Sequence, residues 1–265
     1  MQKVLTAIES DLEYVSIEDL IKTSGYSYYH FHRIFKAYTG ESLKKYIKRL
    51  QLEKALHKMQ IDNQNITQLA IEAGFNMSSS FNKAFKMMFD TNPTTYKRKL
   101  LSLRENYADI EPIKQINIEP IEVYSIRHRG KYEDANKTWD EMIAFASKHK
   151  LFNKNFGAYG ITYDNPDITD SQRLRYDICV TKTKNIQLEE ESPIQIKYLD
   201  GGKYTVFLHK GDPKGLIDVY NSIFGKWLYK NTIVLRDVPV IQKMLGDKSK
   251  ISLDEYLIEV WVPVE

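Results

Sequence analysis

The chain has 265 residues, enough for one large domain or two of ordinary size, and no apolar run approaches the roughly 18 residues of a membrane span. Residues 1–106 hold 16 Lys and Arg against 11 Asp and Glu, whereas the remainder holds 22 against 24, so we expect only the first part to meet a polyanion. The single cysteine, Cys179, excludes an intrachain disulfide and a cysteine metal cage, and its strand-like neighbours predict a buried, inert thiol. Without a signal peptide pattern, a soluble cytoplasmic protein is expected, with no membrane partner.

The N-terminal stretch reads as a series of helices. Residues 4–13 have the spacing of an amphipathic helix whose inward side is Val4, Leu5, Ile8 and Leu12. Ser16 is the expected N-cap of a short helix, with Asp19 at its third position and Gly25 at its end. Ser27 opens the next helix, for which we predict the buried stripe Phe31, Ile34, Phe35 and Tyr38.

A second pair of helices follows in residues 66–96. Small and apolar residues at helical spacing predict a short buried helix that ends at Gly74, where a tight turn begins. The helix after the turn has an apolar side and an opposite side of short polar groups and cations; the apolar side is Phe81, Ala84, Phe85 and Met88. Two helices joined in this way form a helix-turn-helix pattern, although a single copy is also compatible with an ordinary helical hairpin.

The pattern occurs twice, at an offset of 49 to 50 residues. Gly25 matches Gly74, and Phe31, Phe35 and Lys36 match Phe81, Phe85 and Lys86. Between the copies, residues 42–59 predict a strongly periodic helix about 27 Å long. Such a rigid spacer suits two reading helices held about one duplex turn, roughly 34 Å, apart on one face of DNA.

Residues 5–99 resemble the DNA-binding domain of AraC/XylS transcriptional regulators. The resemblance rests on SGYSYYHFHRIFKAYTGESLKKYI, on LAIEAGFNMSSSFNKAFK, and on Pro93 and Tyr96 after them. It implies a sequence-specific regulator of transcription, an activator that works with RNA polymerase on double-stranded promoter DNA. The base-reading residues it implies are Tyr29, His32, Arg33, Ser78, Ser79, Asn82 and Lys83.

Arg33 is the strongest of these candidates, because a guanidinium pairs bidentately with guanine. Phosphate contacts fall more naturally to Lys36, Lys44, Lys45 and Lys86, which give affinity but little sequence choice. Each of these cations also has an ordinary alternative as a solvated surface charge. His30 and His32 point to different sides of a helix, so no metal site is expected.

The helical rhythm is lost over residues 100–118, where Pro112 begins a series of breaks. We therefore expect a DNA-binding domain over residues 1–108, a linker over 109–119 and a second domain over 120–265. The linker is short and poor in Gly and Ser, which favours domains that are held and not loosely tethered.

The second half predicts strands and helices in a repeated order. The expected strands are 122–128, 157–163, 175–181, 203–210, 239–245 and 255–262, and the expected helices are 137–151 and 216–229, the former with Trp139, Met142, Ile143 and Ala146 inward. His128, Arg129 and Gly130 recur 81 residues later as His209, Lys210 and Gly211. The expected fold class is α+β, with an all-α N-terminal domain and a second domain of two β-α-β-β repeats whose junction forms a crevice for a ligand.

Residues 121–264 resemble the GyrI-like small-molecule-binding domain known from multidrug-sensing regulators. IRHRGKYED, LDGGKYTVFLHKG, FGKWL and EVWVPV carry the resemblance. It implies that this half binds a small hydrophobic effector and needs no cofactor.

The expected effector residues come from several elements. In the last strand Glu259 lies on the same face as Trp261, a pairing that suits a lipophilic cation or simply a wet sheet face. Tyr163, Phe224 and Trp227 are further candidates, each with an alternative as core. The family usually has an acid and a phenol where this chain has Gln242 and Met244, so a neutral or weakly anionic effector stays open.

Two other classes of protein compete with an effector-controlled regulator. Some GyrI-like domains are hydrolases of small reactive compounds, but this chain lacks the catalytic motifs that we would expect, and we predict that it is not an enzyme. A ligand-independent DNA-binding protein, with its second half as a partner surface, is the other alternative. The sequence leaves monomer or dimer open.

Overall fold

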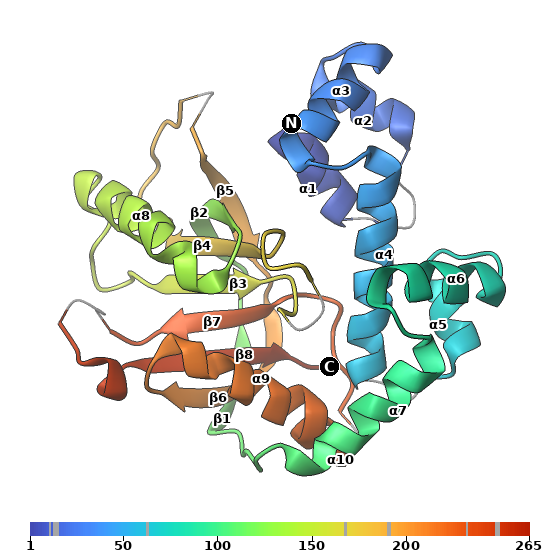
Figure 1. Ribbon diagram of the computed structural model, residues 1–265. Coiled ribbons are helices and arrows are strands. Elements are labelled where there is room, and N and C mark those ends of the chain that lie inside the picture. The colour runs from blue at the N-terminus through green and yellow to red at the C-terminus, as the bar shows by residue number, and fades with distance from the viewer. Residues whose placement is uncertain are drawn as a thin grey trace. The chain divides into compact units, whose positions relative to one another are not determined.

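The computed structural model describes residues 1–10, 12, 16–61, 64–166, 169–189, 192–231, 233–246 and 250–265. Within these residues the chain divides into two units, Met1–Leu103 and Arg104–Glu265. The first is helical and the second is built on a β-sheet, which confirms the predicted α+β class with a helical N-terminal part (Figure 1). Among the described residues, no helix is both long and apolar enough to cross a membrane.

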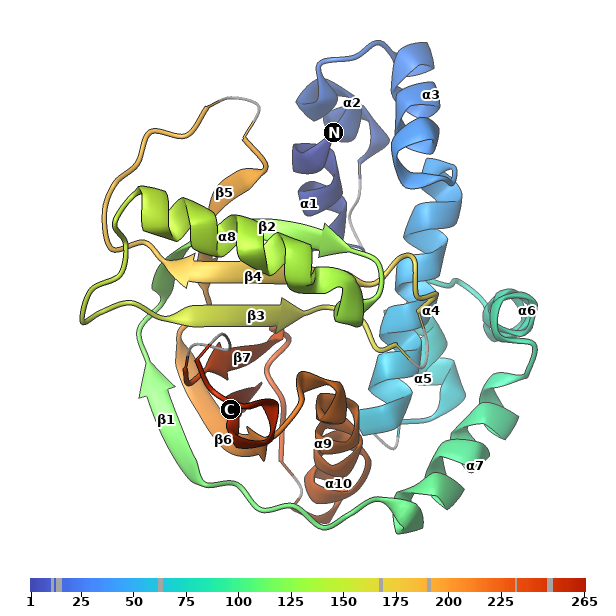
Figure 2. The same ribbon diagram turned by 60° about the vertical axis from the view of Figure 1, so that its left-hand side comes forward.

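The N-terminal unit is arranged along one long helix, α4. The helices are α1 (Gln2–Ser10), α2 (Ile17–Ser24), α3 (Tyr28–Thr39), α4 (Leu43–Ile61), α5 (Ile66–Glu72), α6 (Ser78–Phe89) and α7 (Pro93–Leu103). Helices α2 and α3 lie by the first half of α4, and α5 and α6 lie beside its second half (Figures 1 and 2). Each predicted helix-turn-helix motif is therefore present, one toward each end of the spacer.

Each motif has its own aromatic core against α4. In the first, Phe31 and Phe35 are fully buried, and the Phe35 ring meets Tyr46 of α4 edge to face at 5.4 Å. In the second, Phe81 and Phe85 are fully buried at the equivalent places, and Phe85 meets Tyr96 of α7 at 5.9 Å. Burial of one such side chain contributes about 1.5–3 kcal/mol, so the repeated phenylalanines hold each reading helix within its own motif.

The turn between α5 and α6 depends on Gly74. Its φ of 73° lies in the left-handed region that side chains with a Cβ seldom adopt, and a Cβ there would also lie 2.9 Å from the Gln51 amide. The Asn65 side chain caps α5 by accepting from the Gln68 amide at 2.8 Å. Local residues thus set where α5 begins and where the turn toward α6 follows it.

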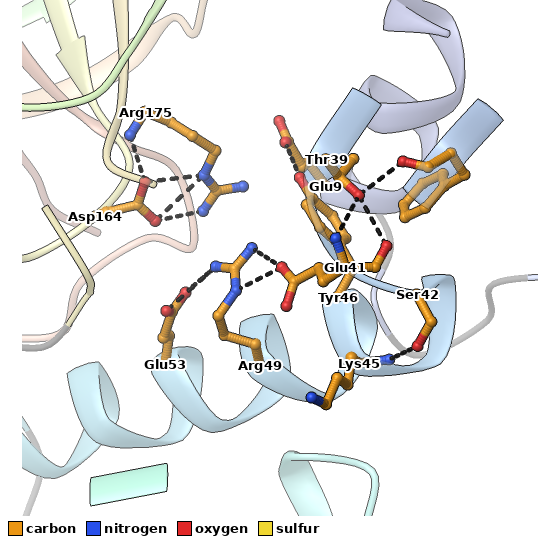
Figure 3. Close-up of polar contacts among 11 residues, drawn as sticks. Glu9, Thr39, Glu41, Ser42, Lys45, Tyr46, Arg49, Glu53, Asp164 and Arg175 are labelled. Carbon is orange, nitrogen blue, oxygen red and sulfur yellow. Dashed lines mark hydrogen bonds and ion pairs between the residues drawn. The ribbon is translucent and has the colours of Figure 1, made fainter. Parts of the chain in front are cut away.

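A buried ion triad ties the first motif to the spacer. The Arg49 guanidinium of α4 donates to Glu41, in the turn before α4, at 2.9 Å and to Glu53, one turn later, at 3.0 Å (Figure 3). All three side chains are buried. Buried ion pairs of this kind add little net stability, but they exclude alternative packings in which a charge would be left unpaired.

Two predictions for the helices of this unit were wrong in detail. Tyr38 is 55% exposed, because it lies about 60° around α3 from Phe35, whereas the buried stripe turns the other way toward Thr39. Helix α7 continues to Leu103, past the point where the sequence loses its apolar rhythm. The rhythm is lost there because the later side chains of α7 are largely exposed. The predicted end of the first helix, beyond residue 10, lies partly outside the described residues.

The C-terminal unit is one antiparallel sheet with helices on one face. Its strands are β1 (Lys114–Ile118), β2 (Ile121–Arg129), β3 (Ala158–Thr162), β4 (Arg175–Thr181), β5 (Ile194–Leu199), β6 (Gly202–Lys210), β7 (Val240–Met244) and β8 (Leu257–Pro263). The order across the sheet is β1-β6-β8-β7-β3-β4-β2-β5. The two repeats meet where β3 pairs with β7, with Gly160 opposite Gln242.

Each repeat has a further first strand that the sequence analysis missed. Strand β1 lies inside the segment predicted to be a linker, 109–119, and β5 is its counterpart in the second repeat. These strands are exchanged: β1 pairs with β6, and β5 pairs with β2. Because two residues join β1 to β2 and two join β5 to β6, the two ends of the sheet must come together, and the sheet is strongly curled.

The two faces of the sheet bury different cores. On the helix side, named here for the face that α8 (Asn136–Lys148) covers, Tyr124, Ile178 and Val180 pack with Met142 of α8 (Figure 2). On the far side, inside the curl, Val123, Cys179 and Trp261 form a separate core. Strand alternation thus decides which chemistry each face has. Ile143, predicted to point inward from α8, is 39% exposed, since it lies about 100° around the helix from Met142.

The second helical segment is not one regular helix. It consists of α9 (Leu216–Ser222), a π-helical turn (Ile223–Trp227) and α10 (Leu228–Asn231). Phe207 of β6 meets Trp227 edge to face at 4.8 Å, which places this segment on the helix side as well. The continuous helix predicted for residues 216–229 is therefore widened by one π turn in its middle.

Candidate nucleic-acid interface and effector site

The outward side of α3 is aromatic and basic. Tyr29 is 81% exposed, and Arg33 and Lys36 are exposed one and two turns further along. His32 differs from the other candidates: it is half-buried under Tyr28, with ring centroids 4.8 Å apart, and its Nε2 is buried with no hydrogen-bond partner among the described residues. The structure thus leaves Tyr29 and Arg33 open to a ligand, and His32 less so.

The outward side of α6 is smaller and more polar. Ser79, Asn82 and Lys83 are exposed, Ser78 at the start of the helix is half-buried, and Lys86 is exposed in the last turn. No side chain caps the start of α6. The two reading helices therefore have different chemistry on equivalent positions, which suits two different groups of bases.

Lysines at the start of α4 extend the basic surface. Lys44 and Lys45 are exposed, whereas Lys48 lies with its ammonium 3.3 Å from the centroid of the Phe75 ring, in the turn of the second motif. Burial there, and then repulsion by Lys44, lowers the pKa of Lys48. Sequence reasoning missed Lys48, since only the fold brings an ordinary helix lysine against an aromatic ring of the next motif.

The predicted effector residues do not form one site. Phe224, Trp227, Gln242 and Met244 belong to the helix side or its helices, whereas Tyr163, Glu259 and Trp261 lie on the far side. Gln242 of β7 is directly opposite Val260 of β8, so Glu259 and Trp261, one residue either way, must face away from it.

A buried polar network occupies the helix side where the repeats meet. The Tyr176 hydroxyl donates to Gln242 Oε1 at 2.9 Å, and Gln242 Nε2 donates to the Tyr220 hydroxyl at 3.1 Å. The Tyr220 hydroxyl also lies 3.1 Å from Thr162 Oγ1. Gln242 is only 4% exposed, so both halves of its amide are used inside the protein.

Aromatic rings surround this network. Tyr220 stacks on Phe224 with centroids 6.0 Å apart and planes at 10°, while Tyr176 packs on Tyr132 at 5.6 Å and near Trp139 at 6.4 Å. Of these rings, the sequence indicated only Phe224 as an effector residue. The others were missed because each comes from a different element, and no local pattern marks them as neighbours.

The network carries no charge at neutral pH. Burial raises the pKa of the Tyr176 hydroxyl well above its ordinary value and also raises that of Tyr220, so both phenols stay protonated. Gln242 has no ionisable group. The network and the rings around it therefore provide no counter-charge for a cation.

The carboxylates of the far side already have protein partners. Glu259, 4% exposed, accepts from Lys114 of β1 and, at 2.9 Å, from Trp261 Nε1. Burial by itself would raise the pKa of Glu259, but the hydrogen bonds from Lys114 and Trp261 lower it overall. Lys243 adds a second positive charge, with its ammonium 5.4 Å from the Trp261 ring centroid.

Tyr163 belongs to a similar closed cluster. It donates at 2.9 Å to Asp177, which is fully buried and also paired with Arg127 and Lys197. The cavity beside Tyr163 and Lys197 has a volume of about 40 Å³, far below the 300–1,000 Å³ of a drug-sized site. Tyr163 thus has no room beside it for such a ligand, and the predicted cation site at Glu259 and Trp261 is occupied by the side chain of Lys114.

The remaining reactive groups give no separate site. Cys179 is buried, as predicted, and burial raises the pKa of its thiol to about 12. Among the described residues, no group of three or more His, Cys, Asp and Glu side chains could hold a metal ion.

Comparison with known proteins matches both units separately. Residues 20–99 match a helix-turn-helix domain family, and residues 111–265 match the GyrI-like small molecule binding domain. The chain is 30% identical over 118 residues to the multiple antibiotic resistance protein MarA of Escherichia coli (strain K12), which covers 44% of this chain and 91% of MarA. It is 31% identical over 102 residues to the transposon Tn10 TetD protein of Escherichia coli, covering 38% and 74%. The EcmrR–DNA complex has a TM-score of 0.47 at 13% identity, over 95% of this chain and 85% of that one.

Two helix-turn-helix motifs braced by one helix, together with the match to the helix-turn-helix family and the similarity to MarA, define a DNA-binding transcription regulator. The chain belongs to the GyrI-like small molecule binding domain family, and it carries this effector-binding domain behind an AraC-type helix-turn-helix domain. Both resemblances seen in the sequence are confirmed.

Proposed function

We propose that α3 and α6 bind successive major grooves of promoter DNA and that a small molecule bound by the C-terminal domain changes this binding. The observation that carries the proposal is the pair of matched motifs, each with a buried Phe pair toward α4 and exposed polar or basic side chains on the reading helix. Helix α4 has 19 residues, so it is about 28 Å long and stiff enough to set the distance between the readers.

Within this proposal the residues have different tasks. On α3, Arg33 reads guanine and Tyr29 contacts neighbouring bases, while His32 reaches a base only if its ring turns out from under Tyr28. On α6, Asn82 and Lys83 read bases with Ser78 and Ser79 at the start of the helix. Phosphates are bound by Lys36, Lys44, Lys45 and Lys86, which makes the affinity fall with salt.

The effector site proposed here is the helix side, where Tyr176, Tyr220 and Phe224 surround Gln242. The effector is small, hydrophobic and neutral, because the rings there offer stacking and the Gln242 network carries no counter-charge for a cation. A cationic effector at Glu259 is disfavoured, since it would have to displace the Lys114 ammonium.

Other features of the proposal come from the resemblance to AraC-type activators. The DNA-bound protein would contact RNA polymerase, raise transcription and work in the cytoplasm beside the chromosome. Regulation of this kind requires no catalytic step, so we assign the protein no enzymatic activity.

The test uses the full-length protein and a duplex enriched from a random-sequence pool by that protein. We expect tighter binding to the enriched duplex than to a scrambled one, and a change of at least about fivefold in its Kd when the neutral dye Nile red saturates the protein. Dye binding is followed by fluorescence of the three tryptophans. Equal affinity for the enriched and scrambled duplexes would contradict the regulator, and a Kd unmoved by bound dye would favour the ligand-independent DNA-binding protein.

A further inference from the structure

The segment that follows α7 is packed against the π-helical turn of the effector-binding domain. The Tyr107 ring lies on the backbone of Gly225, where a Cβ would be 2.4 Å from ring atoms Cδ2 and Cε2. Gly225 is not among the glycines with a positive φ, so its missing side chain matters here for close approach and not for conformation. Any larger residue at position 225 must push the ring away.

Two lysines that follow Gly225 bind the same segment. Lys226 Nζ donates to the Tyr107 carbonyl and to Asp109 Oδ2, both at 2.9 Å, and Lys230 Nζ donates to Asp109 Oδ1 at 2.5 Å. The hydrogen bonds from Lys230 and Lys226 lower the pKa of Asp109 to about 2. Exposed ion pairs are individually weak, but two of them with the ring contact specify one docked position. We name this arrangement of Tyr107 and Asp109 on Gly225, Lys226 and Lys230 the linker latch.

The latch is built on the same turn that carries the effector aromatics. Phe224, which stacks on Tyr220 beside the Gln242 network, is the residue immediately before Gly225. Residues 223–227 form a π-helical turn, a conformation that is rare and recurs at functional sites. A displacement of Phe224 therefore moves Gly225 and Lys226 with it.

We infer that the linker latch transmits effector occupancy to the DNA-binding domain. The inference rests on the proposed effector site at Tyr220 and Phe224. An effector that stacks there moves the π-helical turn, the contacts to Tyr107 and Asp109 loosen, and the chain leaving α7 gains freedom. The two states, latched and released, then differ in the arrangement of the DNA-binding domain and so in DNA affinity.

The latch is tested without any effector, by measuring the Kd of the full-length protein for the enriched duplex. Asp109→Asn removes the ion pairs and Gly225→Ala displaces the ring, and each should shift the Kd in the same direction by about fivefold or more. The double variant should do little more than the larger single change, because both release one contact. Glu105→Gln removes an exposed carboxylate from the same segment and should stay within about twofold of the native Kd.

Hydrogen exchange of residues 105–110 supplies a second readout. Exchange should be faster in Asp109→Asn and Gly225→Ala than in Glu105→Gln, at unchanged melting temperature for Asp109→Asn, which alters only exposed groups. If both latch variants bind the duplex as Glu105→Gln does, the latch plays no part in DNA binding and the inference is overturned.

A parallel experiment with Nile red distinguishes failure of the linker latch from failure of the proposed effector site. Dye that binds the native protein should speed exchange in residues 105–110, and dye that binds without doing so contradicts the latch. If the dye leaves tryptophan fluorescence unchanged, the effector site is wrong for this probe, while the DNA affinities of the latch variants still decide the inference.

Discussion

Arg33 differs from the other exposed cations of the DNA-binding domain in what it can recognise. Its guanidinium lies on the outward side of α3 and can pair with two acceptors of one guanine, whereas a lysine is a point charge. Arg33→Ala should therefore cost roughly 1–3 kcal/mol on the enriched duplex and little on a scrambled one. Fluorescence anisotropy with both duplexes measures the difference.

Lys36→Ala is the matched control, because Lys36 lies about one turn further along α3. It should weaken both duplexes alike and reduce the salt slope by about 1. Equal losses on the two duplexes for Arg33→Ala would make Arg33 a phosphate contact and leave the reading of bases to α6.

Gln242 decides the charge of the effector. Gln242→Glu places a carboxylate between Tyr176 and Tyr220, and we expect tetraphenylphosphonium to bind about tenfold more tightly, with Nile red weakened. Titrations of tryptophan fluorescence give both constants. The control is Glu259→Gln on the far side, which should leave the ratio of the two affinities unchanged. A fall in tetraphenylphosphonium binding by that control would return the effector to Glu259.

Single residues also mark the limit of sequence reasoning. Alternation within β8 correctly separated Glu259 from Ile258 and Val260, but it could not tell which face meets the helices or that Lys114 would reach Glu259. Those facts depend on pairings between residues about 145 positions apart. The polar network of Tyr176, Gln242 and Tyr220 was hidden for the same reason.

At the scale of elements, helices with strong local signals were predicted correctly, whereas strands with weak signals were missed. The repeated Gly and Phe positions located both helix-turn-helix motifs and the spacer, because helical periodicity and capping are local. Strands β1 and β5 were missed because they are edge strands with half-exposed side chains, and their pairing is exchanged between the repeats. The π-helical turn was also missed, since its side chains keep a helical apolar pattern.

The elements differ in what they demand of the sequence. Helix α4 must be rigid, and its buried triad of Glu41, Arg49 and Glu53 fixes how the first motif sits on it. The α9–α10 segment contains a π-helical turn at Phe224 and Gly225, and the proposed linker latch would require it to adopt two conformations.

At the scale of the whole molecule, sequence reasoning recognised two functional parts but misjudged the chain between them. Tyr107 and Asp109 contact the effector-binding domain, and residues 114–118 form β1. The segment predicted to be a linker is therefore a structural part of the C-terminal unit. In the proposed mechanism, a conformational change caused by an effector would reach the DNA-binding domain through this packed segment. Control of DNA affinity by the effector is therefore physically reasonable.

The central claim is that α3 and α6, braced by α4, enter successive grooves on one side of a duplex. Hydroxyl-radical footprinting of the full-length protein on the enriched duplex tests it most directly. We expect two protected patches about 10–10.5 base pairs apart on one face, both of them lost on a scrambled duplex. A single patch, two patches on opposite faces, or equal protection of the scrambled duplex would contradict it.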